Sequence, residues 1–249
     1  MTTIARIGAE ARAASRSFLR RRTAVFFTFG FPLILVGIFG AVVGADPTGS
    51  GLFGHPTGYY VPGYLSVIVL FTPLTRVGSS IARHRDGRRF EKLATTPLNR
   101  FEWLAAHIVV NAGIILAASV VVLAALSVLT DATTVFVPLV VPFVVLAVVV
   151  FCGLGAVLGR VADSQDGVVA ASNAVALPMV FLSETFVAPE LLPAWFRPLV
   201  ALSPLTYFAR GVRAVTYLRA PATRELLVLA ALAGLLFVVG GLAVPQTEA

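Results

Sequence analysis

Two long apolar segments lie almost end to end in this sequence: WLAAHIVVNAGIILAASVVVLAALSVL at residues 103–129 and VFVPLVVPFVVLAVVVFCGLGAVLG at residues 135–159, with only TDATT between them. Neither segment contains Asp, Glu, Lys or Arg. A helix needs about 20 apolar residues to cross the hydrocarbon core of a bilayer, which is roughly 30 Å thick. Each segment is long enough, so the sequence predicts two antiparallel transmembrane helices joined by a very short external turn.

Four further apolar segments flank this pair, at about residues 24–44, 59–81, 167–183 and 226–244. The segment at 59–81 carries one charge, Arg76, close enough to its end for the side chain to reach the lipid headgroups. All six segments are continuously apolar, whereas the wall of a membrane barrel would alternate apolar and polar residues. We therefore predict an all-α integral membrane protein with six transmembrane helices.

The composition agrees with lipid as the solvent for much of the chain. Hydrophobic residues make up 58% of the sequence, charged residues 12%, and the mean hydropathy is +0.91. In ordinary soluble domains, hydrophobic residues make up roughly 45–50% and charged residues about 25%. These values exclude disordered, collagenous and nucleic-acid-binding classes. The single cysteine, Cys152, permits neither an internal disulfide nor a thiolate metal cluster.

The basic residues are distributed unevenly between the two sides of the predicted membrane. Of the 19 Lys and Arg, 13 lie in segments on one side: six in residues 1–23, six in 82–102 and one in 160–166. Five lie on the other side, all between residues 197 and 224. Because Lys and Arg are retained in the cytoplasm, we predict a multi-pass protein of the cell membrane with cytoplasmic N- and C-termini.

Residues 1–23 precede the first span and have a helical pattern of their own. The apolar residues Ile4, Ile7, Ala11, Ala14, Phe18 and Leu19 recur at helical spacing, and four arginines fall largely on another face. This pattern predicts an interfacial helix on the membrane surface, separate from a six-span domain at residues 24–249. The alternative, a simple stop-transfer flank, explains the arginines but not the periodicity.

Residues 83–102 form the longest predicted cytoplasmic loop, and the loop is both charged and patterned. Residues 88–94 can form about two helical turns with Phe90 and Leu93 on one side, and Pro97 would end them. Such a short helix is expected to bury little against its own bundle, so its apolar pair is predicted to dock on another protein. The alternative is a basic loop that only sets topology. The predicted partner-contact residues are Arg88, Arg89, Phe90, Glu91, Leu93 and Pro97.

Residues 184–225 are semi-apolar but too interrupted by proline to span the membrane. Irregular backbone at membrane depth is tolerated only where protein or a wet cavity surrounds it. We therefore predict a re-entrant pair of short helices between spans five and six, with Trp195 and Tyr207 at the interface. Glu184 is the one carboxylate near membrane depth, where it is either functional or structural. The candidate gate residues are Glu184, Pro193, Trp195, Pro204, Tyr207 and Arg213.

The sequence contains no motif of a catalytic or metal site: HExxH, GxSxG and GxxxxGK[ST] are all absent. The three histidines, His55, His84 and His107, fall in an external loop, a cytoplasmic loop and a span, so they are not expected to meet at one metal. Asp163 and Asp166 either mark an ion site or belong to a turn that caps the next helix. We predict no catalytic residue and no metal ligand.

The order of these elements resembles the membrane subunits of ABC type-2 exporters, a permease family that includes drug, polysaccharide and copper-maturation exporters. The resemblance covers nearly the whole chain and includes the loop EKLATTP at residues 91–97. Its most specific part is Pro178 followed by LPAW at 192–195, SPLTY at 203–207, and Arg213. The family more often has glycine where Glu184 stands and Asn-Pro where SP stands at 203–204.

The resemblance implies the non-catalytic half of an ATP-driven exporter, with amphiphilic drugs, lipid-linked molecules or polymers as candidate cargo. Such permeases form homodimers or heterodimers on two cytoplasmic ATPase subunits, which hold ATP and Mg²⁺ and act through the loop after span two. Because this chain lacks GxxxxGK[ST], the ATPase would be a separate polypeptide and this chain would carry no cofactor. The implied partners are the ATPase, a second permease and the lipid bilayer, with no nucleic acid.

A secondary transporter or channel that works alone is the alternative from another functional class. An inverted repeat would favour it, but spans one to three show no convincing similarity to spans four to six. An intramembrane enzyme and a structural anchor rank lower. An ATPase encoded in the neighbouring reading frame would decide for the exporter.

Overall fold

The computed structural model describes residues 2–45, 57–129, 137–185 and 197–245. Within these ranges every regular element is helical and none is a strand, which confirms the predicted all-α class. The longer helices are α1 (Thr3–Leu19), α2 (Arg22–Ala45), α3 (Val61–Asp86), α5 (Arg100–Leu129), α6 (Val140–Val161), α7 (Gln165–Phe181) and α10 (Thr223–Ala243). The shorter elements are η1 (Thr57–Tyr60), α4 (Arg89–Ala94), α8 (Arg197–Leu202), α9 (Pro204–Arg213) and η4 (Ala214–Leu218).

Among the described helices, four are long and apolar enough to cross a membrane: Gly58–Asp86, Arg100–Val128, Val140–Val161 and Thr223–Ala243. A fifth candidate is the pair Thr3–Leu19 and Arg22–Ile38, whose helices meet at 78°. Helix α7 has 17 residues, about 26 Å at 1.5 Å per residue, which is slightly less than a bilayer core of roughly 30 Å. The structure therefore supports four or five spans, and the sixth remains a prediction.

The predicted segments coincide with helices, but several of the helices, α3 and α5 among them, extend beyond their apolar parts. Helix α3 continues to Asp86 instead of ending near residue 81, and α5 begins at Arg100 instead of residue 103. A helix ends where its backbone hydrogen bonds stop, and charged residues continue it beyond the membrane. Helix α6 begins at Val140, whereas its predicted start at residue 135 and the turn before it lie outside the described residues.

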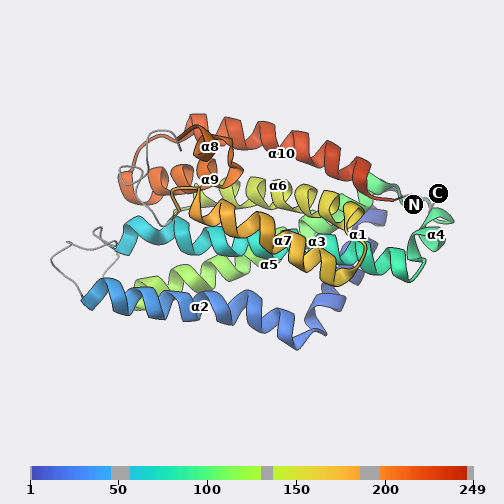
Figure 1. Cartoon of the computed structure of the whole chain (residues 1–249), viewed down its shortest axis with the longest axis horizontal. Helices are drawn as coiled ribbons and strands as arrows, with labels where there is room; N and C mark the ends of the chain where they lie inside the picture. The colour runs from blue at the N-terminus through green and yellow to red at the C-terminus, as the bar shows by residue number, and fades with distance from the viewer. Residues whose placement is uncertain (1, 46–56, 130–136, 186–196, 246–249) are drawn as a thin grey trace.

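The long helices run side by side, so the bundle has two distinct ends (Figure 1). One end, here called the α4 end, carries α4, the start of α1 and the last turn of α10. The opposite end, the α9 end, carries α8 and α9. Helices α3 and α6 form the centre of the bundle, where Leu65, Leu74, Val148 and Phe151 are fully buried. The N-terminal helix and α10 thus reach the same side of the bundle, as the predicted topology requires.

Glycines allow the central helices to approach backbone to backbone. A Cβ on Gly159 would lie 2.7 Å from the Gly78 carbonyl oxygen, which fixes the contact between α3 and α6. A Cβ on Gly240 would lie 2.6 Å from the Gly153 Cα, which fixes the contact between α6 and α10. Small residues are favoured at helix interfaces in lipid, because association there depends on close packing. Helix α6 therefore joins α3 and α10 by its glycines.

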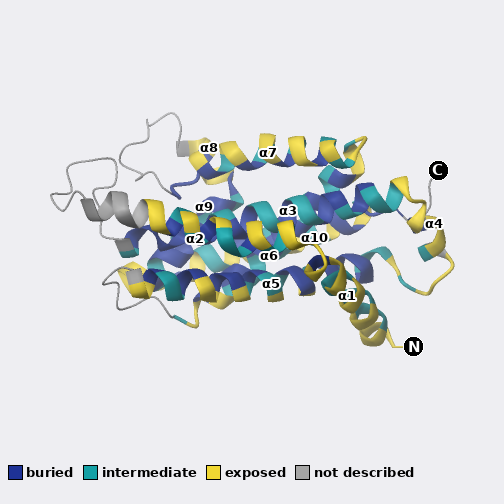
Figure 2. Cartoon of the chain, turned by 90° about the horizontal axis from the view of Figure 1, so that it is seen from below, coloured by how far each residue is buried: buried dark blue, intermediate teal, exposed yellow. Residues whose placement is uncertain are grey.

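The outer surface of the bundle is also apolar. Exposed residues lie along the outward faces of α1 and α7 (Figure 2). Large apolar side chains are exposed on α2, α5, α7 and α10, including Phe27, Val109, Phe181 and Leu235. A soluble protein would place polar residues on such faces. The interior and the exterior are both apolar, as lipid requires.

Candidate functional site

Helix α4 is a short helix with defined ends between α3 and α5. Its N-cap residue Arg88 has left-handed backbone angles, with φ 49°, and turns the chain sharply after α3. At its C-terminal end the Thr96 hydroxyl donates to the Leu93 carbonyl oxygen at 2.7 Å. The helix ends at Ala94, ahead of Pro97. The predicted short helix in this loop is therefore present.

Phe90 is packed against its own bundle. Its side chain is only 3% exposed, and its ring makes edge contacts with His84 and Trp103 at centroid distances of 5.4 and 5.9 Å. The expectation that α4 buries little against its own bundle is therefore wrong for Phe90, which anchors α4 to α3 and α5. His84 lies in the part of α3 that extends beyond the apolar segment, so this extension provides the surface on which Phe90 packs.

The other predicted contact residues form what we call the coupling surface. This surface comprises Arg88, Arg89, Glu91, Leu93 and Pro97. Leu93 is half-buried, and the other four residues are exposed. Beside it, a groove of about 330 Å³ lies between α4 and the end of α10, and its lining includes Leu93, Pro97, Trp103 and Val244. The α4 end thus presents a charged helix next to a partly apolar groove, a combination suited to a protein partner.

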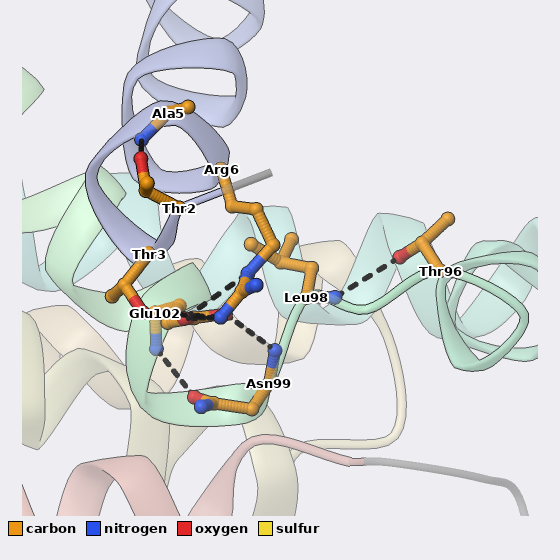
Figure 3. A network of polar contacts seen from close by, with 8 residues as sticks. All are labelled: Thr2, Thr3, Ala5, Arg6, Thr96, Leu98, Asn99 and Glu102. Carbon is orange, nitrogen blue, oxygen red and sulfur yellow. Dashed lines mark hydrogen bonds and ion pairs between the residues drawn. The ribbon is translucent and has the colours of Figure 1, made fainter.

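The start of α5 forms a reciprocal cap that also binds α1 (Figure 3). The Glu102 N–H donates to Asn99 Oδ1 at 2.8 Å, and the Asn99 N–H donates to Glu102 Oε2 at 3.0 Å, as in a capping box. The Arg6 guanidinium donates through Nε to both Glu102 carboxylate oxygens, at 3.0 and 3.2 Å, and forms an ion pair with it through Nη2. The carboxylate raises the pKa of Arg6 above its ordinary value through this hydrogen bond.

A second contact between α1 and α5 lies one turn further along. Glu10 Oε1 lies 3.6 Å from His107 Nε2, and the His107 ring stacks on Trp103 at a centroid distance of 3.9 Å. Sequence reasoning missed both attachments of α1. The spacing of Asn99 and Glu102 could have indicated the cap, but no local pattern predicts partners this far apart in the chain.

At the α9 end, four residues form what we call the outer cluster: Tyr59, Glu184, Arg210 and Arg213. The Arg210 Nε donates to Glu184 Oε2 at 2.8 Å. The Arg213 Nη2 donates to the Glu184 carbonyl oxygen at 2.7 Å, and its guanidinium lies 4.2 Å from the Tyr59 ring centroid. Glu184 is 4% exposed and has a φ of 55°. Its carboxylate is therefore held in a partly buried ion pair, and it joins the segment after α7 to α9.

The remaining gate candidates are placed in part. Pro204 lies in the first turn of α9. The backbone N–H groups of a first turn have no partner within the helix, so the N–H that proline lacks is not missed there. The Tyr207 hydroxyl donates to the Ala201 carbonyl oxygen at 2.8 Å, which ties α9 to α8. Pro193 and Trp195 lie outside the described residues. The two short helices α8 and α9 agree with the predicted pair, while their re-entrant depth remains a prediction.

A larger pocket of about 940 Å³ opens between α1, α3, α4 and α7. It is lined by basic residues from several of these elements, and it lies next to the coupling surface, with which it shares Arg89 and Leu93. Throughout the described ranges, no group of three or more His, Cys, Asp or Glu side chains is placed to hold a metal ion.

Comparison with known proteins identifies a family. A family model described as ABC-2 type transporter matches residues 7–217. The matched region begins in α1 and ends in η4, so it includes the coupling surface and the described part of the outer cluster. A search of curated proteins gives no match.

Proposed function

This chain belongs to the ABC-2 type transporter family, and we propose that it is the membrane permease subunit of an exporter driven by ATP. The family assignment and the apolar helices make it a multi-pass membrane permease of the ABC transporter class. We propose further that ATP is hydrolysed by a separate cytoplasmic ATPase bound in two copies. The permease would pair with a second permease, identical or similar, and would carry amphiphilic, lipid-linked or polymeric cargo out of the cell.

The attachment of α4 to α3 and α5 is the observation that supports this proposal. Phe90 fixes α4 between His84 on α3 and Trp103 on α5, while Arg88, Arg89 and Glu91 stay exposed. A force applied to the charged face would therefore reach two membrane helices at once. A partner that changes shape on ATP binding requires such a rigid contact to move the permease.

Helix α3 provides a continuous path from the coupling surface to the other end of the bundle. It is the most extensively buried long helix, and its glycine contact with α6 leaves little room for independent sliding. At the α9 end, η1 precedes α3, and the Tyr59 carbonyl oxygen accepts from Arg213 at 3.4 Å. A displacement of α3 would move Tyr59 and so alter its contact with Arg213 in the outer cluster. This link supports alternating access between the two ends of the bundle.

We place the α4 end in the cytoplasm because of the basic residues there. Of the 19 Lys and Arg, 13 lie in residues 1–23, 82–102 and 160–166, and these segments reach the same end of the bundle. The test is thiol labelling in a Cys152→Ala background. Gly87→Cys should react with an impermeant reagent only after lysis, whereas Arg219→Cys should react in intact cells. The reverse pattern would contradict this orientation.

The exposed face of α7 supports pairing with a second permease. Ala170, Asn173 and Ala174 lie on this face and are exposed, as is Leu177 one turn further on. An amide in the middle of a membrane helix is poorly solvated by lipid, and small residues allow close approach of another helix. We infer that α7 packs on a second permease across this face.

The direct test of the proposed function is purification of the chain from its native membranes. We expect an ATP-binding subunit to co-purify in a ratio of one to one, and the complex to hydrolyse Mg-ATP. The same chain separated from that subunit should neither bind nor hydrolyse ATP. Saturable ATP binding by the isolated chain, or transport without any ATPase, would favour a transporter that works alone.

A further inference from the structure

The pocket at the α4 end has a strong excess of positive charge. Its lining includes five side chains that are cationic at neutral pH: Arg21, Arg76, Arg83, Arg89 and Lys92. The same lining contains a single carboxylate, Glu10, which faces His107. We call this space of about 940 Å³ the basic pocket. A cavity of this charge attracts anions.

The two arginines of α3 that line the pocket are held in place by neutral partners. Arg76 Nη1 donates to Asn111 Oδ1 at 3.2 Å, and its guanidinium lies 4.4 Å from the Phe18 ring centroid. Arg83 Nη2 donates to Ser80 Oγ at 3.0 Å. In the part of the chain that the structure describes, no carboxylate forms an ion pair with either arginine. Partly buried cations are costly without an anionic partner, so the geometry leaves a place for one.

The chemistry of the other lining residues narrows the class of ligand. Thr75, Ser79 and Ser80 contribute hydroxyl groups beside the arginines, and arginine forks with hydroxyl donors are the usual partners of phosphate oxygens. The lining also includes apolar residues, with Ala14 and Phe18 of α1 and Val169 of α7. The pocket thus combines a cationic part with an apolar part, as an amphiphile requires.

We propose that the basic pocket binds the phosphate group of an amphiphile. Arg76 and Arg83 hold the phosphate, Lys92 lies at the α4 side, and the hydrocarbon chain lies against Ala14 and Val169. That this ligand is cargo rests on the proposed function, whereas its binding does not. The neighbouring residues Arg89 and Leu93 belong also to the coupling surface, so an occupied pocket lies beside the partner contact.

The test measures binding to the full chain in phosphatidylcholine nanodiscs without any ATPase. One arm titrates inorganic phosphate by calorimetry. The other adds dioleoyl phosphatidic acid to the nanodisc and counts retained lipid by native mass spectrometry. Binding of phosphatidic acid identifies a lipid headgroup, and binding of inorganic phosphate alone identifies a free anion. Either result supports phosphate recognition, and binding in neither arm overturns it.

Charge-removing variants locate the site. Arg76→Gln and Arg83→Gln should each weaken binding about tenfold or more, and Lys92→Gln, at an exposed position, should weaken it without endangering the fold. The matched control is Arg160→Gln, which removes an exposed charge at the same end outside the pocket lining. Equal losses in the control and in Lys92→Gln would overturn the site. Because no ATPase is present, such a failure leaves the proposed permease role intact.

Discussion

Phe90 packs its ring edge against Trp103 at a centroid distance of 5.9 Å, and this contact joins the short surface helix α4 to the first turns of α5. Both side chains are buried, and His84 of α3 closes the cluster from the other side. The two residues predicted to dock on a partner therefore differ in their surroundings. Phe90 is buried and holds α4 in place, whereas Leu93 stays partly accessible. Mutation of the two residues should therefore give different results.

Phe90→Ala should loosen α4 from the bundle. Removal of a buried phenyl ring costs about 3–5 kcal/mol in well-packed cores, and here the loss falls on a six-residue helix with few other anchors. We expect faster amide hydrogen exchange across α4 and a lower Tm of the chain. Leu93→Ala should leave both nearly unchanged. Equal exchange rates in the two variants would contradict the anchoring role.

The coupling surface should bind the ATPase through its charges. Arg88→Glu together with Arg89→Glu should release the ATPase during purification and abolish ATP-dependent transport, with no change in Tm, because both side chains are exposed. The matched control reverses two exposed arginines outside α4, Arg12→Glu and Arg160→Glu. If the control releases the ATPase to the same extent, general electrostatic attraction and not α4 explains the binding.

Glu184 allows the backbone and the charge to be tested separately. Its φ of 55° costs a non-glycine residue about 1–2 kcal/mol, whereas its carboxylate binds Arg210. Glu184→Gly and Glu184→Ala both lose the ion pair, but only the glycine variant relieves the backbone. We expect the alanine variant to be less stable than the glycine variant by about 1 kcal/mol, measured by denaturant unfolding in micelles. Equal stability would show that the backbone relaxes in the alanine variant.

Two glycines of α10 provide a matched pair for the packing of the bundle. A Cβ at Gly240 would meet the Gly153 backbone, whereas a Cβ at Gly234 meets nothing within 4 Å. Gly240→Ala should therefore destabilise the chain by about 1–3 kcal/mol through overpacking. Gly234→Ala should be neutral or stabilising by up to about 1 kcal/mol through helix propensity. The comparison of the two Tm values decides between packing and propensity.

The pairing of two permeases should be visible as a disulfide across α7. In a Cys152→Ala background, Asn173→Cys should form a covalent dimer on mild oxidation in membranes, because Asn173 lies on the exposed face of α7. Val239→Cys, exposed on α10, is the control and should stay monomeric. More efficient crosslinking from α10 would move the interface away from α7.

Local patterns predicted the elements of the fold but not their contacts. Continuous apolarity located α5, α6 and α10, and the spacing of Phe90, Leu93 and Pro97 located α4. Apolarity does not show where a helix ends, so the extension of α3 to Asp86, and with it the surface on which Phe90 packs, was not predicted. The contact between Arg6 and Glu102 joins residues 96 positions apart, a distance at which no periodic pattern carries information.

Helix α1 also determines how the first apolar helix can respond to its surroundings. Two side-chain contacts fasten α1 to α5, through Arg6 and Glu10, and α2 leaves α1 at 78°. The start of α2 is therefore held close to the bundle, and further along α2 the side chain of Val36 is fully buried in the core. We therefore expect a change of bilayer thickness to be taken up at the joint of residues 20–21, as a change of the angle between α1 and α2.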